Sequence, residues 1–87
     1  MKIKDGYILR NIGGSDIVVA VGAESRRFSN MIKLNSTAAF IWKCLESETT
    51  EEELVKKLTE QYDVSEEQAK ADVSALLARI REAGILV

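Results

Sequence analysis

The spacing of apolar residues changes once along the chain, at about residue 35, and this change limits the possible folds more than any other feature. Before it, branched and aromatic residues cluster in short runs, which is typical of strands. After it, apolar residues recur every three or four positions, which is typical of helices. A chain of 87 residues can fill one modest core. The pattern therefore predicts one domain over residues 1–87, with a small antiparallel sheet beside a helical cluster, an α+β fold.

The first part of the chain has the signature of a β-hairpin. Two runs, Tyr7–Ile12 and Asp16–Val21, flank Gly13-Gly14-Ser15, and the glycines can adopt the positive φ angles of a tight turn. A polar stretch from Gly22 to Asn30 follows. The short apolar run Met31–Leu34 then predicts a third strand, which we expect at an edge of the sheet.

Three helices are predicted after residue 35. The first begins behind an Asn35 or Ser36 cap, and the second begins at the capping-box pattern Thr50-Glu51-Glu52-Glu53. The third begins after Ser65 and ends before Gly84. The expected core faces are Ala38, Ile41, Trp42 and Leu45 in the first helix, Leu54, Leu58 and Tyr62 in the second, and Ala69, Val73, Leu76, Leu77 and Ile80 in the third.

The order of these elements predicts a winged helix-turn-helix, a three-stranded antiparallel sheet followed by three helices. Only Asp63-Val64 joins the second and third helices, and a hairpin packed beside such a pair forms a wing. One hypothesis that follows is a DNA-binding transcription regulator. Its third helix would have to meet phosphates and base edges with basic or amide side chains.

The charge distribution argues against that hypothesis. Ser65–Glu82 carries three basic and four acidic residues, and Glu51–Tyr62 carries two basic and four acidic residues. Met1–Leu34 has the opposite balance, six basic against three acidic. An acidic or mixed peptide lying along the sheet suits this asymmetry better than a duplex does, so we expect no nucleic-acid partner. A structural subunit that binds through Ile85-Leu86-Val87 or an apolar sheet face is a third hypothesis.

The residues that are missing limit the chemistry. The chain has no histidine and one cysteine, Cys44, so His-containing catalytic pairs and zinc sites are excluded. Glycine-rich phosphate-binding motifs are also missing. We expect no catalytic residues, no metal and no cofactor. No apolar run approaches the about 18 residues of a membrane span, and no segment resembles a signal peptide, so we expect no membrane partner and a cytoplasmic location.

The third strand is the candidate binding element. An edge strand offers unpaired N–H and C=O groups, to which an extended peptide can add. Alternation sends Ile32 and Leu34 to one face, and Met31 and Lys33 to the other. An alternative reading is that Lys33 only protects the edge from aggregation. Spacing alone does not decide between them.

Met31-Ile32-Lys33-Leu34-Asn35-Ser36-Thr37-Ala38-Ala39-Phe40-Ile41-Trp42 resembles the strand-to-helix signature of the PqqD family. The segment from Ala71 to Leu86 is similar to that family's last helix and closing Gly-apolar turn, and Thr50 to Tyr62 is similar to its middle helix. The resemblance covers nearly the whole chain.

This resemblance implies a non-catalytic peptide chaperone, or recognition element, for ribosomally made and post-translationally modified peptides. The leader segment of a precursor would add to the third strand and place side chains between that strand and the third helix. A separate enzyme, often a radical-SAM enzyme, would then modify the held peptide. The implied binding positions are Met31, Ile32, Lys33 and Leu34 on the strand, and Asp72, Leu76 and Arg79 on the helix. The longer, arginine-bearing stretch from Gly22 to Asn30 departs from the quinone-pathway members and implies a different peptide product.

Overall fold

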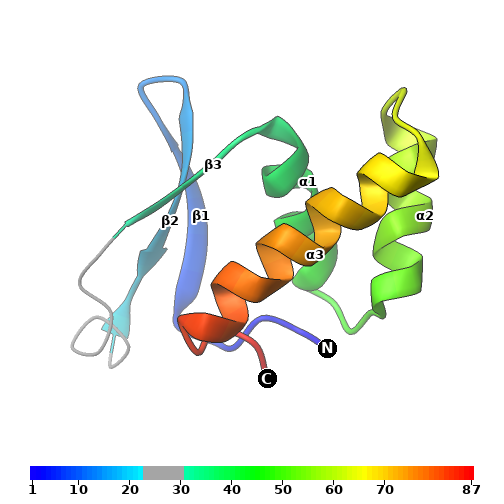
Figure 1. The fold of residues 1–87 in the computed structure, drawn as a ribbon. Helices are drawn as coiled ribbons and strands as arrows, with labels where there is room; N and C mark the ends of the chain where they lie inside the picture. Colours follow the sequence, from blue (N-terminus) through cyan, green and yellow to red (C-terminus); the bar gives the residue numbers. More distant parts are fainter. Residues whose placement is uncertain (23–30) are drawn as a thin grey trace.

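The structure, a computed structural model, describes residues 1–22 and 31–87. It confirms the predicted fold, a three-stranded antiparallel sheet followed by three helices (Figure 1). The strands are β1 (Tyr7–Ile12), β2 (Ser15–Ala20) and β3 (Ile32–Leu34), and the helices are α1 (Ser36–Leu45), α2 (Glu51–Gln61) and α3 (Glu66–Glu82). Each predicted element is present, and the differences concern its ends.

The hairpin closes through a two-residue turn rather than the three-residue one expected. Gly13 and Gly14 have φ angles of 60° and 84°, and Ile12 pairs with Ser15. Positive φ at both central positions is the requirement of a type I′ turn, whose twist matches that of the strands. Ser15 therefore begins β2, and β2 ends at Ala20 instead of Val21.

The third strand lies at the edge of the sheet, as predicted. The strand order is β1-β2-β3, and β3 pairs antiparallel with β2. It is one residue shorter than expected, because Met31 lies just before it. Of the polar stretch Gly22–Asn30, only Gly22 is among the described residues.

Side-chain caps start all three helices. Asn35 accepts a hydrogen bond from the Ala38 amide (2.8 Å), and Ser65 accepts one from the Gln68 amide (3.1 Å). Thr50 accepts one from the Glu53 amide (3.2 Å). The other half of that capping box differs from the prediction, because the Glu53 carboxylate accepts a hydrogen bond from the Thr49 hydroxyl (3.1 Å).

One hydrophobic core lies between the sheet and the helices. The predicted stripe of α3 is buried in full, and Trp42 is fully buried. In α1, Ala39 is buried while the predicted Ala38 is half-buried. In α2, Val55 is buried, whereas Tyr62 is half-buried with its ring edge-on to Phe40, 5.6 Å between centroids.

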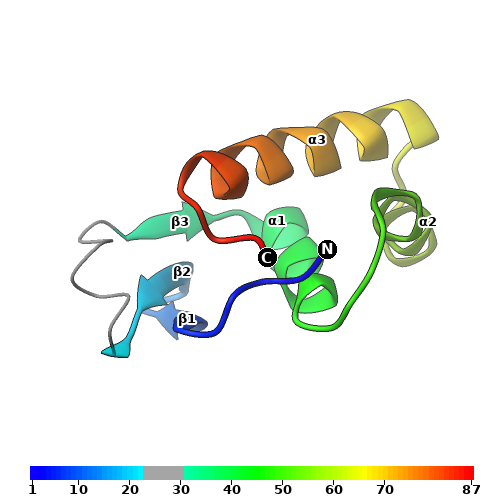
Figure 2. The same cartoon turned by 90° about the horizontal axis from the view of Figure 1, so that it is seen from below.

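The two ends of the chain pair with each other and cover one edge of this core. Ile85 is fully buried, and Leu86 forms a β-bridge with Ile3, which is also buried. The amide of Val87 donates to the Lys2 carbonyl (2.8 Å), and Figure 2 shows the two termini side by side. This pairing of the C-terminal tail with the N-terminal segment was not predicted from the sequence.

Candidate functional site

The free edge of β3 faces the same side of the molecule as α3. Figure 2 shows β3 as the strand nearest α3, with β2 and β1 successively farther away. Within the described ranges 1–22 and 31–87, β3 pairs with no strand besides β2. The site is therefore built from the last strand of the sheet and the last helix of the chain.

The ladder determines which backbone groups of β3 point outward. The Val21 amide donates to the Gly6 carbonyl (2.7 Å), so this pair exchanges hydrogen bonds, as does every second pair along the hairpin. Ile17 therefore bonds to β1, and its neighbours Asp16 and Val18 bond to β3. Their partners are Leu34 and Ile32. By the same alternation, the N–H and C=O of Lys33 point away from β2, toward the free edge.

Side chains of β3 alternate as predicted. Leu34 is 4% exposed and belongs to the core, and Ile32 is half-buried and packs against the core. Lys33 is exposed, and Met31, just outside the strand, is 66% exposed. Leu34 thus directs both its backbone and its side chain into the protein, while Lys33 presents backbone groups at the edge.

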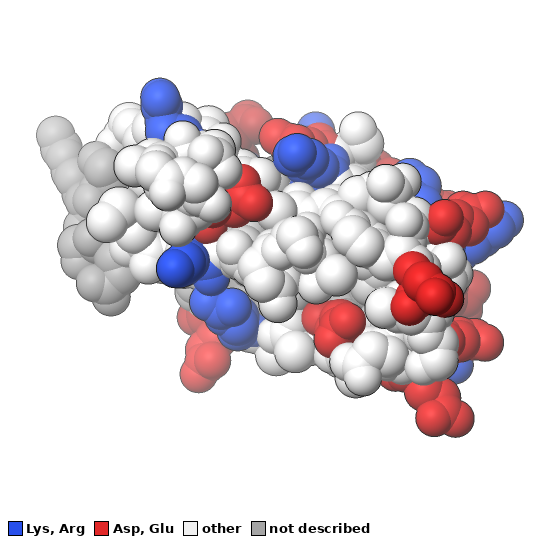
Figure 3. Space-filling view, turned by 90° about the horizontal axis from the view of Figure 1, so that it is seen from above, with Lys and Arg blue, Asp and Glu red and all other residues white. Residues whose placement is uncertain are grey.

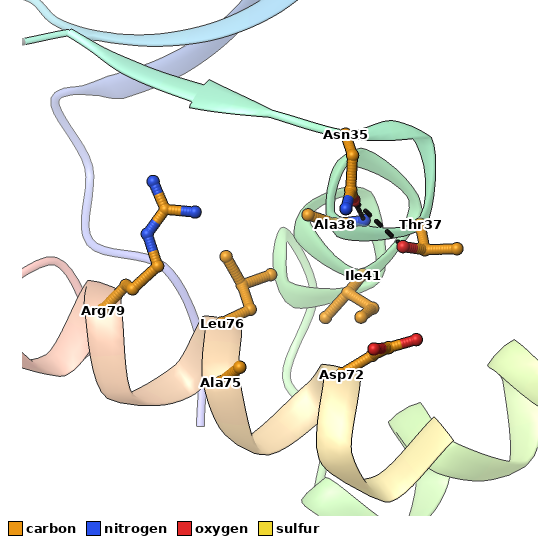
Figure 4. Close-up of a pocket in the computed structure, with 8 residues that line it drawn as sticks. All are labelled: Asn35, Thr37, Ala38, Ile41, Asp72, Ala75, Leu76 and Arg79. Atoms are coloured by element: carbon orange, nitrogen blue, oxygen red, sulfur yellow. Dashed lines mark hydrogen bonds between the residues drawn. The ribbon is translucent and has the colours of Figure 1, made fainter. Parts of the chain in front are cut away.

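A pocket of about 110 Å³ lies where β3 passes into α1, opposite α3. It contains all three helix residues implied by the family resemblance, Asp72, Leu76 and Arg79 (Figure 4). The other lining residues are Asn35, Thr37, Ala38, Ile41 and Ala75. The four strand residues do not line it, so the predicted positions form two adjoining parts, an edge and a pocket.

The helix wall of the pocket follows from helical spacing. Asp72, Ala75, Leu76 and Arg79 lie three, four and seven positions apart, on one face of α3. Leu76 is 3% exposed, so its side chain forms the floor, while Ala75 and Arg79 are exposed. Figure 4 shows Arg79 projecting from α3 toward β3, and Asp72 at the opposite end, below Thr37. The pocket therefore has an apolar floor with one charge of each sign at its ends.

The other wall is the start of α1, which sequence reasoning treated only as a cap and core. Asn35 accepts hydrogen bonds from the Ala38 amide and from the Thr37 hydroxyl (2.9 Å), so these bonds hold the polar rim in place. On the helix side, Gln68 Nε2 donates to Asp72 Oδ1 (2.9 Å). Arg79 makes no ion pair with any residue in the described part of the chain. One sequence signal could have indicated this wall. The cap residue Asn35 directly follows Leu34, the last residue of β3, so the start of α1 lies beside the end of the strand.

Charge is distributed unevenly around the site. Figure 3 shows an uncharged centre on the upper face, with Asp and Glu side chains gathered toward α2. The described residues before β3 and in it carry Lys2, Lys4, Arg10 and Lys33 against Asp5 and Asp16. The predicted basic character of the sheet side thus holds there, while Glu24, Arg26 and Arg27 lie outside the described residues. No group of three metal-ligating side chains occurs among the residues described, and none of the helices described is long and apolar enough to cross a membrane.

Comparisons with known proteins agree with this architecture. The chain matches the family described as coenzyme PQQ synthesis protein D (PqqD) over residues 7–86. No curated protein matches it significantly. It is similar to the solved structure "TbiB1 in Complex with the TbiA(beta) Leader Peptide", with a TM-score of 0.75, 21% identity, and coverage of 99% of this chain and 94% of that chain.

A second solved structure, "Lasso peptide synthetase B1 complexed with the leader peptide", has a TM-score of 0.73 and 20% identity, and the match covers 97% of this chain and 93% of that one. At these identities the likeness concerns the fold. The family match extends from the first residue of β1 to the residue before the last, and the resemblance noted in the sequence lies within it. On this match, the chain belongs to the PqqD family.

Proposed function

We propose that this protein binds the leader segment of a ribosomally made precursor peptide and presents it to a separate modifying enzyme. The observation that carries the proposal is the free edge of β3 beside a pocket that holds Asp72, Leu76 and Arg79. Membership of the PqqD family supports it, and so do the two similar structures, both of which are complexes with leader peptides. We place the protein in the cytoplasm, where precursor and enzyme would meet.

The leader adds to β3 as a fourth strand in this proposal. Its main chain bonds to the outward N–H and C=O of Lys33, with Met31 extending the edge. Ile32 offers its half-buried side chain beside the edge, and Leu34 anchors the strand to the core. The short length of β3 limits the main-chain bonds to a few, so side-chain contacts must supply the specificity.

The pocket takes one apolar side chain of the leader. Its floor is Leu76 and its rim carries Asp72 and Arg79, about 10 Å apart along the axis of α3 at a rise of about 1.5 Å per residue. A leader with an apolar residue flanked by charged residues of opposite sign fits this arrangement. Each charge then meets the opposite sign at the rim, which favours one register over others.

The protein acts by holding the peptide, without contributing a reacting group. Binding the leader keeps the core peptide near the enzyme and converts a bimolecular encounter into a tethered one, with effective concentrations in the mM range for short flexible linkers. The partner is a peptide-modifying enzyme, and radical-SAM enzymes are the class that the family resemblance implies.

An NMR titration tests the proposal. The ligand is a synthetic leader-like peptide in which an apolar residue is flanked by charged residues of opposite sign, and a scrambled peptide of the same composition is the control. We expect amide shifts along residues 31–35 and 72–79 with the leader only. Shifts confined to α2, or equal binding of the scrambled peptide, would contradict the assignment of the site.

The DNA-binding alternative finds no support in the residues described. Helix α3 carries Lys70, Arg79 and Arg81 against four carboxylates, and α2 is acid-rich at its start. Such helices repel a phosphate backbone. A gel shift at low salt with random-sequence duplex should show no complex, and a salt-sensitive complex would reinstate this alternative.

A further inference from the structure

The sheet has a second apolar face, directed away from the core. Alternation along the ladder places Leu9 and Val18 on the core side and their neighbours on the opposite side. We call this opposite side the outer face; its residues are Ile8, Ile12, Ile17, Val19 and Val21, with Arg10 from β1, Ser15 from β2 and Lys33 from β3. Within the described chain, none of its five apolar residues belongs to the hydrophobic core or packs against it.

The last four residues of β2 and the residue after it are apolar on both faces of the sheet. Ile17, Val18, Val19, Ala20 and Val21 follow one another without a polar residue, a pattern typical of strands covered on both sides. Figures 1 and 2 show all three helices on one side of the hairpin, so no described helix covers the other side. Ile12 and Val21 are 52% and 39% exposed, while Ile8, Ile17 and Val19 are half-buried and lie between them on the same face. Apolar residues that are contiguous on one face mark an interaction surface, whereas single exposed apolar residues do not.

The charges on the outer face are of one sign. Arg10 and Lys33 are both exposed, and neither has an ion-pair partner within residues 1–22 and 31–87. Asp16, the carboxylate of β2, has the opposite orientation in the ladder. Among the residues described, the outer face holds no carboxylate that a second copy of this chain could bring to these cations. The charges therefore favour a different partner, one with an apolar surface bordered by carboxylates.

The outer face is continuous with the edge proposed to bind the leader. Lys33 has its side chain on the outer face and its main-chain groups at the free edge of β3. A leader strand added there extends the sheet, and every second side chain of the leader then joins the outer face. A protein seated on this face would touch the domain and the bound leader together.

We infer that the outer face is the docking surface for the modifying enzyme, which contributes an apolar patch bordered by Asp and Glu side chains. The inference rests on the proposed function, because it takes the enzyme as the occupant. In this arrangement the enzyme contacts the outer face of this protein and the outward side chains of the added leader strand together. Leader-loaded protein therefore binds the enzyme more tightly than leader-free protein does.

Methyl NMR tests the location directly. The probe is a purified peptide-modifying enzyme of the radical-SAM class, added to protein with labelled Ile, Leu and Val methyl groups. We expect the methyl signals of Ile17 and Val19 to broaden or shift first, while Val18, their neighbour on the core side, changes less. Equal changes at Val18, or changes confined to the helices, would overturn the inference.

Two variants test the chemistry. Ile17→Glu and Arg10→Glu should each weaken enzyme binding by at least about tenfold, as expected for residues central to an interface. Leader affinity should stay within about twofold, since neither side chain lines the pocket. Lys57→Glu, an exposed cation of α2, is the matched control and should change neither affinity. If Ile17→Glu lowers the melting temperature, its weaker enzyme binding could come from unfolding, and the enzyme affinity of Arg10→Glu then decides whether the docking surface is correct.

The remaining outcomes separate the two proposals. Unchanged enzyme affinity in both variants overturns the docking surface even if the leader binds. A wild-type dimer that becomes monomeric in Ile17→Glu also overturns it, because the occupant is then a second copy. Failure of the wild type to bind the leader, with enzyme binding retained and sensitive to Arg10→Glu, refutes the proposed leader site and leaves the docking surface standing.

Discussion

Filling the pocket with a protein side chain should displace the leader without unfolding the domain. Ala75 lines the pocket from an exposed position of α3, so Ala75→Leu adds three carbons there and keeps a strong helix former. The pocket of about 110 Å³ has room for roughly three or four methyl-sized groups at about 30 Å³ per water-sized group. The new side chain therefore occupies most of it.

The expected loss of affinity follows from the same volume. A leader side chain that buries three carbon groups gains ~2.4 kcal/mol at ~0.8 kcal/mol per group. Excluding it should raise the dissociation constant about 50-fold, at about 1.4 kcal/mol per factor of ten. Ala78→Leu is the matched control, because Ala78 is exposed on the same helix and does not line the pocket.

Fluorescence anisotropy of a dye-labelled leader peptide measures both variants. Trp42, the only tryptophan, is fully buried, so its emission during thermal unfolding reports whether each variant remains folded. We expect Ala78→Leu to bind like the wild type. If Ala75→Leu also does so while folded, no leader side chain enters the pocket and the reasoning is refuted.

The remaining predictions concern the edge, the cap and the core. Lys33→Pro should abolish leader binding and keep the fold, because the Lys33 N–H faces the free edge, where proline is tolerated. Ile32→Pro removes a hydrogen bond to β2 and should lower the free energy of unfolding by ~1–3 kcal/mol in urea titrations. Equal losses of stability in the two variants would contradict the assigned ladder. Asn35→Ala should cost about 1 kcal/mol by losing the cap of α1, and an unchanged melting curve would show that the cap contributes nothing. Leu58→Ala, at a fully buried position of α2, should cost ~2–5 kcal/mol, and a cost below 1 kcal/mol would mean that the core is loosely packed there.

Local signals predicted the helices well. The Ser65 cap and the apolar stripe predicted the start and the buried face of α3, because both signals depend on residues within a few positions of one another. The same spacing put Asp72, Leu76 and Arg79 on one face, although their choice came from the family resemblance. The structure places all three around one pocket.

The far wall of the pocket could not be predicted in this way. Thr37 and Ala38 lie opposite α3 only because the chain turns directly from β3 into α1 and α3 then crosses it. That is a tertiary arrangement, to which no short-range pattern corresponds. The bridge between Ile3 and Leu86 was not predicted for the same reason, because its two residues lie at opposite ends of the sequence.

Lys33 need not serve only one of the two roles that its position allows. A charged side chain on a short edge strand discourages indiscriminate pairing with other chains. In β3 that side chain lies on the outer face, while the N–H and C=O of the same residue point along the sheet toward the free edge. The Lys33 charge therefore does not block the free edge, and it attracts a peptide or partner that brings a carboxylate to the outer face. Protection of the edge and selection of the leader are thus compatible, and Lys33→Ala should separate them: leader affinity falls little, because the main chain is kept, whereas concentration-dependent aggregation increases.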